Sequence, residues 1–188
     1  MDKAFDPNQS LQLISEILKK TQDSFSQNSF GFKLWGWLVS IASFITYVLI
    51  SQTTVNQSYI AFPVCATIGI IASIWYYKKQ RSISGTETYL NYYLNRMWLV
   101  LGFSFFLTVF ISIQNDIQPF SYTLIIAGIG TTISGLTIKF RPLVMGGILF
   151  FLASASSVFI SNELQPLLHG FAILAGYLVP GYLLSHQK

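Results

Sequence analysis

Apolar positions in this chain are grouped into long runs that are separated by short polar connections. Six runs are present, at roughly residues 34–52, 59–77, 97–113, 119–138, 143–161 and 166–185. None of the six contains Asp, Glu, Lys or Arg. A helix needs about 20 mostly apolar residues to cross the hydrocarbon core of a membrane. The pattern therefore predicts an all-α integral membrane protein with six transmembrane helices.

Basic residues occur only in alternate connections between these runs. They are Lys3, Lys19, Lys20, Lys33, Lys78, Lys79, Arg81, Arg96, Lys139, Arg141 and Lys188. The connections near 53–58, 114–118 and 162–165 have no Lys or Arg, and two of them hold Asp116 and Glu163. Because Lys and Arg are enriched in cytoplasmic loops, we expect a multi-pass protein of the plasma (inner) membrane with both termini in the cytoplasm.

Glycines recur at matched distances from the basic residues that open the odd-numbered runs. Gly69, Gly130 and Gly176 follow Lys33, Arg96 and Arg141 by 36, 34 and 35 residues. A fixed period is typical of repeated units, which favours three tandem helical hairpins over residues 33–78, 96–139 and 141–185. The alternative is that any pair of antiparallel spans has a similar length. Glycines allow close approach of membrane helices, and the candidates for this role are Gly69, Gly130, Gly135, Gly176 and Gly181.

The segment before the first run, residues 1–32, is polar and has helical periodicity of its own. Apolar residues at helical spacing, Leu11, Ile14, Leu18 and Phe25, form one face of a predicted amphipathic helix. This helix is too polar to span a membrane, so we expect it in the cytoplasm, ahead of a transmembrane domain at 33–188. It is expected to lie on the inner leaflet, to cover the bundle, or to serve as a docking face for another protein.

Composition adds little evidence for chemistry. Charged residues make up 10% of the chain, there is one cysteine, and the net charge of +4 is scattered rather than gathered into a nucleic-acid-binding patch. No paired carboxylates, metal-ligand spacing or phosphate loop is present. The sequence thus predicts no enzyme activity, no cofactor or metal, and no nucleic-acid partner.

Polar residues inside the runs are the remaining candidates for function. The hydroxyl groups of the fourth and fifth runs and the histidine of the sixth either line a weakly polar crevice or join adjacent helices by hydrogen bonds. They are Thr131, Thr132, Ser134, Ser154, Ser157 and His169.

Two functions are consistent with this pattern. The first is a non-enzymatic sensor, scaffold or accessory subunit, surrounded by the lipid bilayer, whose partner is a second copy of the chain or another membrane or cytoplasmic protein. The alternative is a small transporter or channel for a neutral or weakly polar solute. The absence of charge from all six runs favours the first, because transport usually leaves ionisable groups in the membrane.

Overall fold

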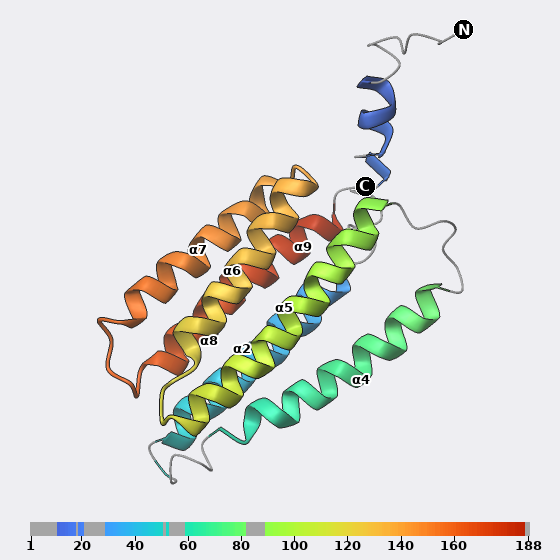
Figure 1. Ribbon diagram of the computed structural model, residues 1–188. Helices are drawn as coiled ribbons and strands as arrows, with labels where there is room; N and C mark the ends of the chain where they lie inside the picture. The colour runs from blue at the N-terminus through green and yellow to red at the C-terminus, as the bar shows by residue number, and fades with distance from the viewer. Residues whose placement is uncertain are drawn as a thin grey trace, which may run out of the picture.

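The computed structural model describes residues 11–17, 19–20, 29–50, 52, 59–81 and 89–186 of the 188-residue chain. All regular structure in these ranges is helical (Figure 1). The labelled helices are α2 (Phe30–Ile50), α4 (Ala61–Arg81), α5 (Tyr89–Gln114), α6 (Phe120–Thr137), α7 (Arg141–Ser157), α8 (Gln165–Ile173) and α9 (Val179–Ser185), and the π-helical turn η1 (Leu174–Leu178) joins α8 to α9.

Five helical stretches of the described chain are long and apolar enough to cross a membrane. They are Phe30–Ile50, Ala61–Lys79, Tyr89–Gln114, Phe120–Thr137 and Gln165–Ser185. The all-helical, multi-pass part of the prediction is therefore supported. The fifth predicted span, 143–161, differs, because α7 has 17 residues and ends at Ser157. Hydroxyl groups of its last turn donate to the helix's own carbonyls, from Ser156 to Leu152 and from Ser157 to Ser154, and such bonds weaken the ladder.

From α2 to α8, successive helices run in opposite directions, and α9 continues the direction of α8, so the connections alternate between the two ends of the bundle (Figure 1). The helix ends at one end are Ile50, Ala61, Gln114, Phe120, Ser157 and Gln165. Asp116 and Glu163 lie in connections at this end, which we call the acidic end. The described basic residues Lys33, Lys78, Lys79, Arg96, Lys139 and Arg141 lie at or near the other end, which we call the basic end.

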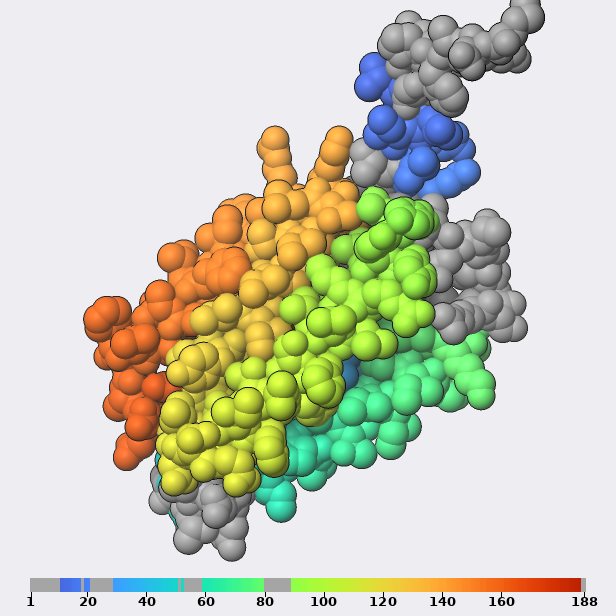
Figure 2. Space-filling view, viewed as in Figure 1, coloured from blue at the N-terminus to red at the C-terminus, as the bar shows by residue number. Residues whose placement is uncertain are grey.

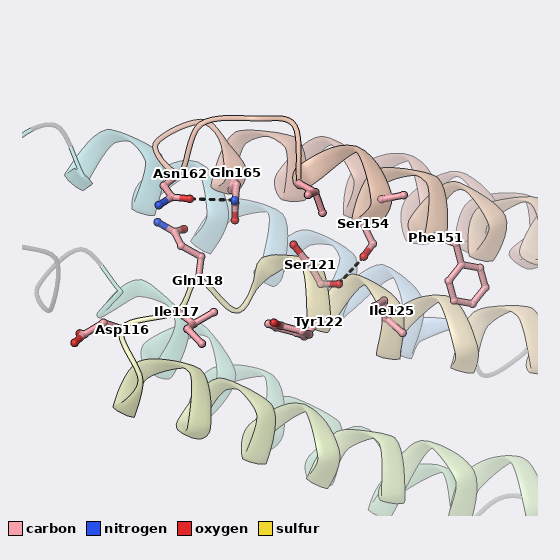
Figure 3. A pocket seen from close by; sticks show the side chains of 12 residues that line it. Asp116, Ile117, Gln118, Ser121, Tyr122, Ile125, Phe151, Ser154, Asn162 and Gln165 are labelled. Carbon is pink, nitrogen blue, oxygen red and sulfur yellow. Dashed lines mark hydrogen bonds between the residues drawn. The ribbon is translucent and has the colours of Figure 1, made fainter.

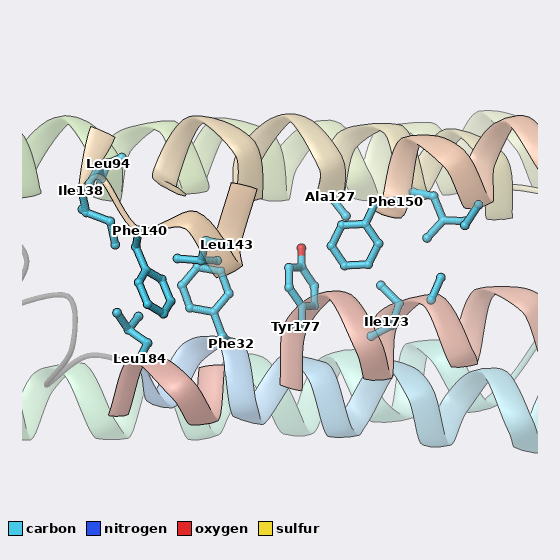
Figure 4. Close-up of a cluster of buried hydrophobic side chains, with 13 residues drawn as sticks. Phe32, Leu94, Ala127, Ile138, Phe140, Leu143, Phe150, Ile173, Tyr177 and Leu184 are labelled. Atoms are coloured by element: carbon cyan, nitrogen blue, oxygen red, sulfur yellow. The ribbon is translucent and has the colours of Figure 1, made fainter. Parts of the chain in front are cut away.

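The centre of the bundle is formed by α2, α6, α7 and the continuous stretch from α8 to α9, while α4 and α5 lie on its flank. α2 packs against α8, η1 and α9, while α6 packs along α7, which also contacts α8, η1 and α9. α4 packs on α2, and α5 packs on α6 (Figure 2). The buried hydrophobic core lies between the central helices (Figure 4). Its members are Phe32, Leu94, Leu124, Ala127, Ile138, Phe140, Leu143, Phe150, Ala153, Ala172, Ile173, Tyr177 and Leu184.

The last span is interrupted by the π-helical turn, directly before Pro180. A proline inside a helix has no N–H to donate to the carbonyl four residues earlier, which here belongs to Gly176. A π turn is one way to accommodate such a missing bond. Pro63, by contrast, lies in the first turn of α4, where a missing N–H costs no helical hydrogen bond.

Candidate functional site

His169 lies where three helices meet inside the bundle, with 1% of its surface exposed. Its Nδ1 is 2.8 Å from Ser43 Oγ on α2, and its Nε2 is 3.2 Å from Thr123 Oγ1 on α6. The rings of Phe62 and Phe120 lie 6.2 Å and 5.2 Å from the imidazole ring, centre to centre. Both ring nitrogens therefore have hydroxyl partners. This arrangement links α8 to α2 and α6 and leaves no open position for a ligand.

The three predicted polar residues on the basic half of α6 do not line one space. Thr131 Oγ1 donates to Ala127 O at 2.7 Å within the same helix. Ser134 Oγ accepts a 3.0 Å hydrogen bond from Trp98 Nε1 on α5. Thr132 Oγ1 is buried, faces Gly147 of α7, and has no hydrogen-bond partner in the described part of the chain. The structure thus places these residues at three different helix contacts.

Ser154 and Ser157 belong to a hydroxyl network at the acidic end, between α6 and α7. Ser154 Oγ donates to Ser121 O at 2.9 Å, and Ser157 Oγ donates to Ser154 O at 2.6 Å. The hydroxyls of Ser121 and Ser157 are 2.5 Å apart. Gln165 Nε2 adds a 3.4 Å bond to Ser157 O, which ties the start of α8 to the same network.

A groove of about 820 Å³ opens beside this network (Figure 3). Its polar lining consists of Asp116, Gln118, Ser121, Tyr122, Ser154, Asn162 and Gln165, and its apolar lining of Ile117, Ile125, Phe151, Ala155 and Val158. Of the residues predicted from sequence, only Ser154 lines it. Gln118 and Gln165 were not predicted from sequence, although their positions beside Pro119 and Pro166, at the polar ends of two apolar runs, were a usable signal.

The five predicted packing glycines all lie at contacts between helices. A Cβ atom on Gly69 would be 2.9 Å from the Trp35 ring on α2, and one on Gly130 would be 2.7 Å from Leu101 on α5. Gly135 lies against the backbone of Val144 on α7. A Cβ atom on Gly176 would likewise meet the ring of Phe150, and one on Gly181 would meet Phe32.

The predicted amphipathic face near the N-terminus is described only in part. Residues 11–17 and 19–20 are helical, and Leu11 and Ile14 are 65% and 54% exposed. Leu18 and Phe25 lie outside the described residues. A hydrogen bond and the positive charge of Lys20, whose Nζ is 2.9 Å from Glu16 Oε1, lower the pKa of Glu16. This exposed ion pair adds little stability. The described part of the predicted face, Leu11 and Ile14, is an exposed apolar surface on a polar helix.

Metal ligands are not gathered anywhere in the described ranges, where no group of three or more His, Cys, Asp or Glu side chains lies together. Cys65 is a free, half-buried thiol on α4. Comparison of the chain with family models, curated proteins and solved structures gives no match. The features of the described chain that bear on function are therefore the groove, the buried hydrogen bonds and the exposed N-terminal face.

Proposed function

We propose that this chain is a six-span protein of the plasma (inner) membrane that acts without catalysis, as a sensor, scaffold or accessory subunit. The observation that carries the proposal is the use of polar groups within the bundle. His169 on α8 contacts the hydroxyls of Ser43 on α2 and Thr123 on α6, and the hydroxyls of Ser154 and Ser157 donate to backbone carbonyls. A bundle joined in this way is a rigid support rather than a site for chemistry.

Three tandem hairpins are supported by equivalent contacts within each pair of helices. The residue five positions after each opening basic residue lies against the matched glycine of the returning helix. These pairs are Leu38 with Gly69, Leu101 with Gly130, and Gly146 with Gly176. In the third pair a glycine replaces leucine, which brings the two backbones together. The shared position of the contact favours a repeated unit over three hairpins of merely similar length.

The sixth span is α7 in this proposal, although a 17-residue helix is about 25 Å long and the hydrocarbon core is about 30 Å thick. Its packing along α6 and against α8, η1 and α9 supports a full crossing. The absence of Lys and Arg from the connection at 162–165 supports the same count, since Lys and Arg are enriched in cytoplasmic loops and this connection would then lie outside.

Single-cysteine labelling tests this topology. In a Cys65→Ala background, we expect Glu163→Cys to react with a membrane-impermeant maleimide in intact cells and Lys188→Cys to react only after permeabilisation. If α7 failed to cross, the chain would have five spans. The pattern would then reverse, with Glu163→Cys protected and Lys188→Cys labelled from outside.

The N-terminal face supplies the surface through which the protein acts in this proposal. Native mass spectrometry of protein extracted gently from its own membranes is expected to show a stoichiometric complex, with a second copy or another protein. Leu11→Glu with Ile14→Glu should dissociate it, because two charges then enter the apolar contact. Gln12→Glu with Ser15→Glu adds the same charge at the same spacing on neighbouring positions and should leave the complex intact. A complex that survives the first pair would contradict a role for this face.

Transport is the second candidate, favoured by the groove at the acidic end and the buried hydroxyls beyond it. On this alternative, Ser154→Ala, Ser157→Ala and Thr132→Ala reduce solute flux into proteoliposomes. A supporting or sensing bundle tolerates the same three changes without loss of its complex.

A further inference from the structure

The serine hydroxyls beside the groove donate their protons to protein atoms and not to the groove. Ser154 Oγ donates its proton to Ser121 O, and Ser157 Oγ donates to Ser154 O. Because the Ser157 proton is already used, the 2.5 Å contact between the Ser121 and Ser157 hydroxyls requires Ser121 to be the donor. The hydroxyls of Ser121 and Ser154 therefore offer the groove their oxygen lone pairs, not their protons.

Two buried side-chain carbonyls add to this set of acceptors. Gln165 is 9% exposed, and its Oε1 atom is buried without a hydrogen-bond partner, as is Oε1 of Gln118. The orientation of the Gln165 amide follows from its neighbours, since Nε2 faces the Ser157 carbonyl at 3.4 Å and Asn162 Oδ1 at 3.3 Å. A carbonyl oxygen buried without a donor is costly, and a ligand with N–H groups would satisfy both glutamines.

The charge of the groove has one sign. Among the described residues that line it, Asp116 is the only acid, and none is Lys, Arg or His. Asp116 adopts the left-handed conformation, with φ of 55°, as the chain turns out of α5. The Ile117 N–H closes this turn with a 2.9 Å bond to Ser112 O, a pattern typical of helix C-termini. Asp116 is exposed at the end of the groove, and its carboxylate gives the lining a negative charge that favours a cation.

Apolar side chains continue the groove away from this polar rim. Figure 3 shows Asn162, Gln165 and Gln118 grouped near the connections, with Ile125 and Phe151 farther along α6 and α7. Ile125 and Phe151 are 40% and 37% exposed. The remaining donors of the lining are few, namely the amide groups of Gln118 and Asn162 and the Tyr122 hydroxyl.

We infer that this groove binds the primary ammonium group of an amphipathic amine, with the ammonium among the acceptors and its hydrocarbon part along Ile125 and Phe151. A free alkylamine and the ethanolamine headgroup of a lipid present the same chemistry. Such an amine would be the ligand of the proposed sensor. Its binding rests on the proposed function only for the side of the membrane from which the ligand enters.

The test measures binding to purified full-length protein in nanodiscs, with empty nanodiscs subtracted. Hexylammonium should bind about tenfold more tightly than hexyltrimethylammonium, because the quaternary ion keeps the charge but has no N–H donor. Asp116→Asn and Gln118→Met should each weaken hexylammonium binding about tenfold, since the first removes the negative charge of the lining and the second removes an acceptor for the ammonium. Glu163→Gln is the matched control, because this acid lies at the same end but does not line the groove.

A second experiment distinguishes a free amine from a lipid headgroup as the ligand. If the ligand is a lipid headgroup, native mass spectrometry of the protein from nanodiscs of mixed phosphatidylethanolamine and phosphatidylcholine should show phosphatidylethanolamine bound to the protein. The Asp116→Asn variant should lose this bound lipid. Hexylammonium binding without lipid retention indicates a free amine. Equal binding of the two hexyl ions, or unchanged binding in both Asp116→Asn and Gln118→Met, overturns the inference. That result leaves the complex and topology tests untouched, because neither uses the groove.

Discussion

Replacing Gly147 with alanine is expected to destabilise the bundle by about 1–3 kcal/mol, because the contact between α6 and α7 has no room for a methyl group. A Cβ atom on Gly147 would collide with Thr132 Oγ1 and would be 2.8 Å from the Thr132 backbone nitrogen. The hydroxyl could rotate away, but the backbone could not move without separating the two helices. Gly135 lies on the same contact, where a Cβ would be 2.6 Å from Val144 N.

The measurement is the thermal unfolding midpoint of purified protein in detergent, followed by loss of helical circular dichroism. Gly102→Ala is the matched control, because Gly102 lies on α5 with no atom within 4 Å of an added Cβ. Alanine is the better helix former by about 1 kcal/mol, so the control should unfold at the same temperature or slightly higher. Equal midpoints for Gly147→Ala and Gly102→Ala would contradict the close packing of α6 on α7.

Helix positions were predictable from sequence because uncharged runs of this length are stable as helices in a membrane. The third run, 97–113, for example, lies wholly within α5, which extends from Tyr89 to Gln114. The alternation of basic and acidic connections was equally visible. The end of α7 was not, since hydropathy alone does not register that Ser156 and Ser157 bond back to their own helix.

Which residues meet across two helices could not be predicted from a single sequence. Ser43 and His169 are separated by 126 positions, and α4, α5 and α7 each carry Ser or Thr residues that would serve equally well as partners. The facing of two helices depends on the packing of all their side chains together. For the same reason, the groove was missed: its character depends on which hydroxyl protons are already used, and that is a property of the assembled bundle.

Replacing His169 with alanine is expected to cost about 3 kcal/mol, the second large effect that the structure predicts. The change removes a fully buried ring that contacts Phe120 and Phe62, and it leaves a cavity at the junction of three helices. It also removes the hydrogen bonds to Ser43 and Thr123. A neutral imidazole has one N–H, so one of these hydroxyls accepts from the ring while it donates to its own helix, and the other donates to the ring. Without the ring, both hydroxyl protons can go to Val39 O and Phe120 O in their own helices, so the loss comes mainly from the cavity and from the link between helices.

A second substitution separates the volume of His169 from its polarity. His169→Phe retains a ring but makes neither hydrogen bond, and hydrogen bonds between membrane helices contribute about 0.6 kcal/mol each on average. We therefore expect His169→Phe to unfold between the wild type and His169→Ala in the same detergent assay. His186→Ala is the control, since the other histidine is exposed at the basic end and should leave the midpoint unchanged. If His169→Ala unfolds together with this control, His169 does not join the three helices. If His169→Phe is as stable as the wild type, the hydrogen bonds contribute nothing and only the ring volume matters.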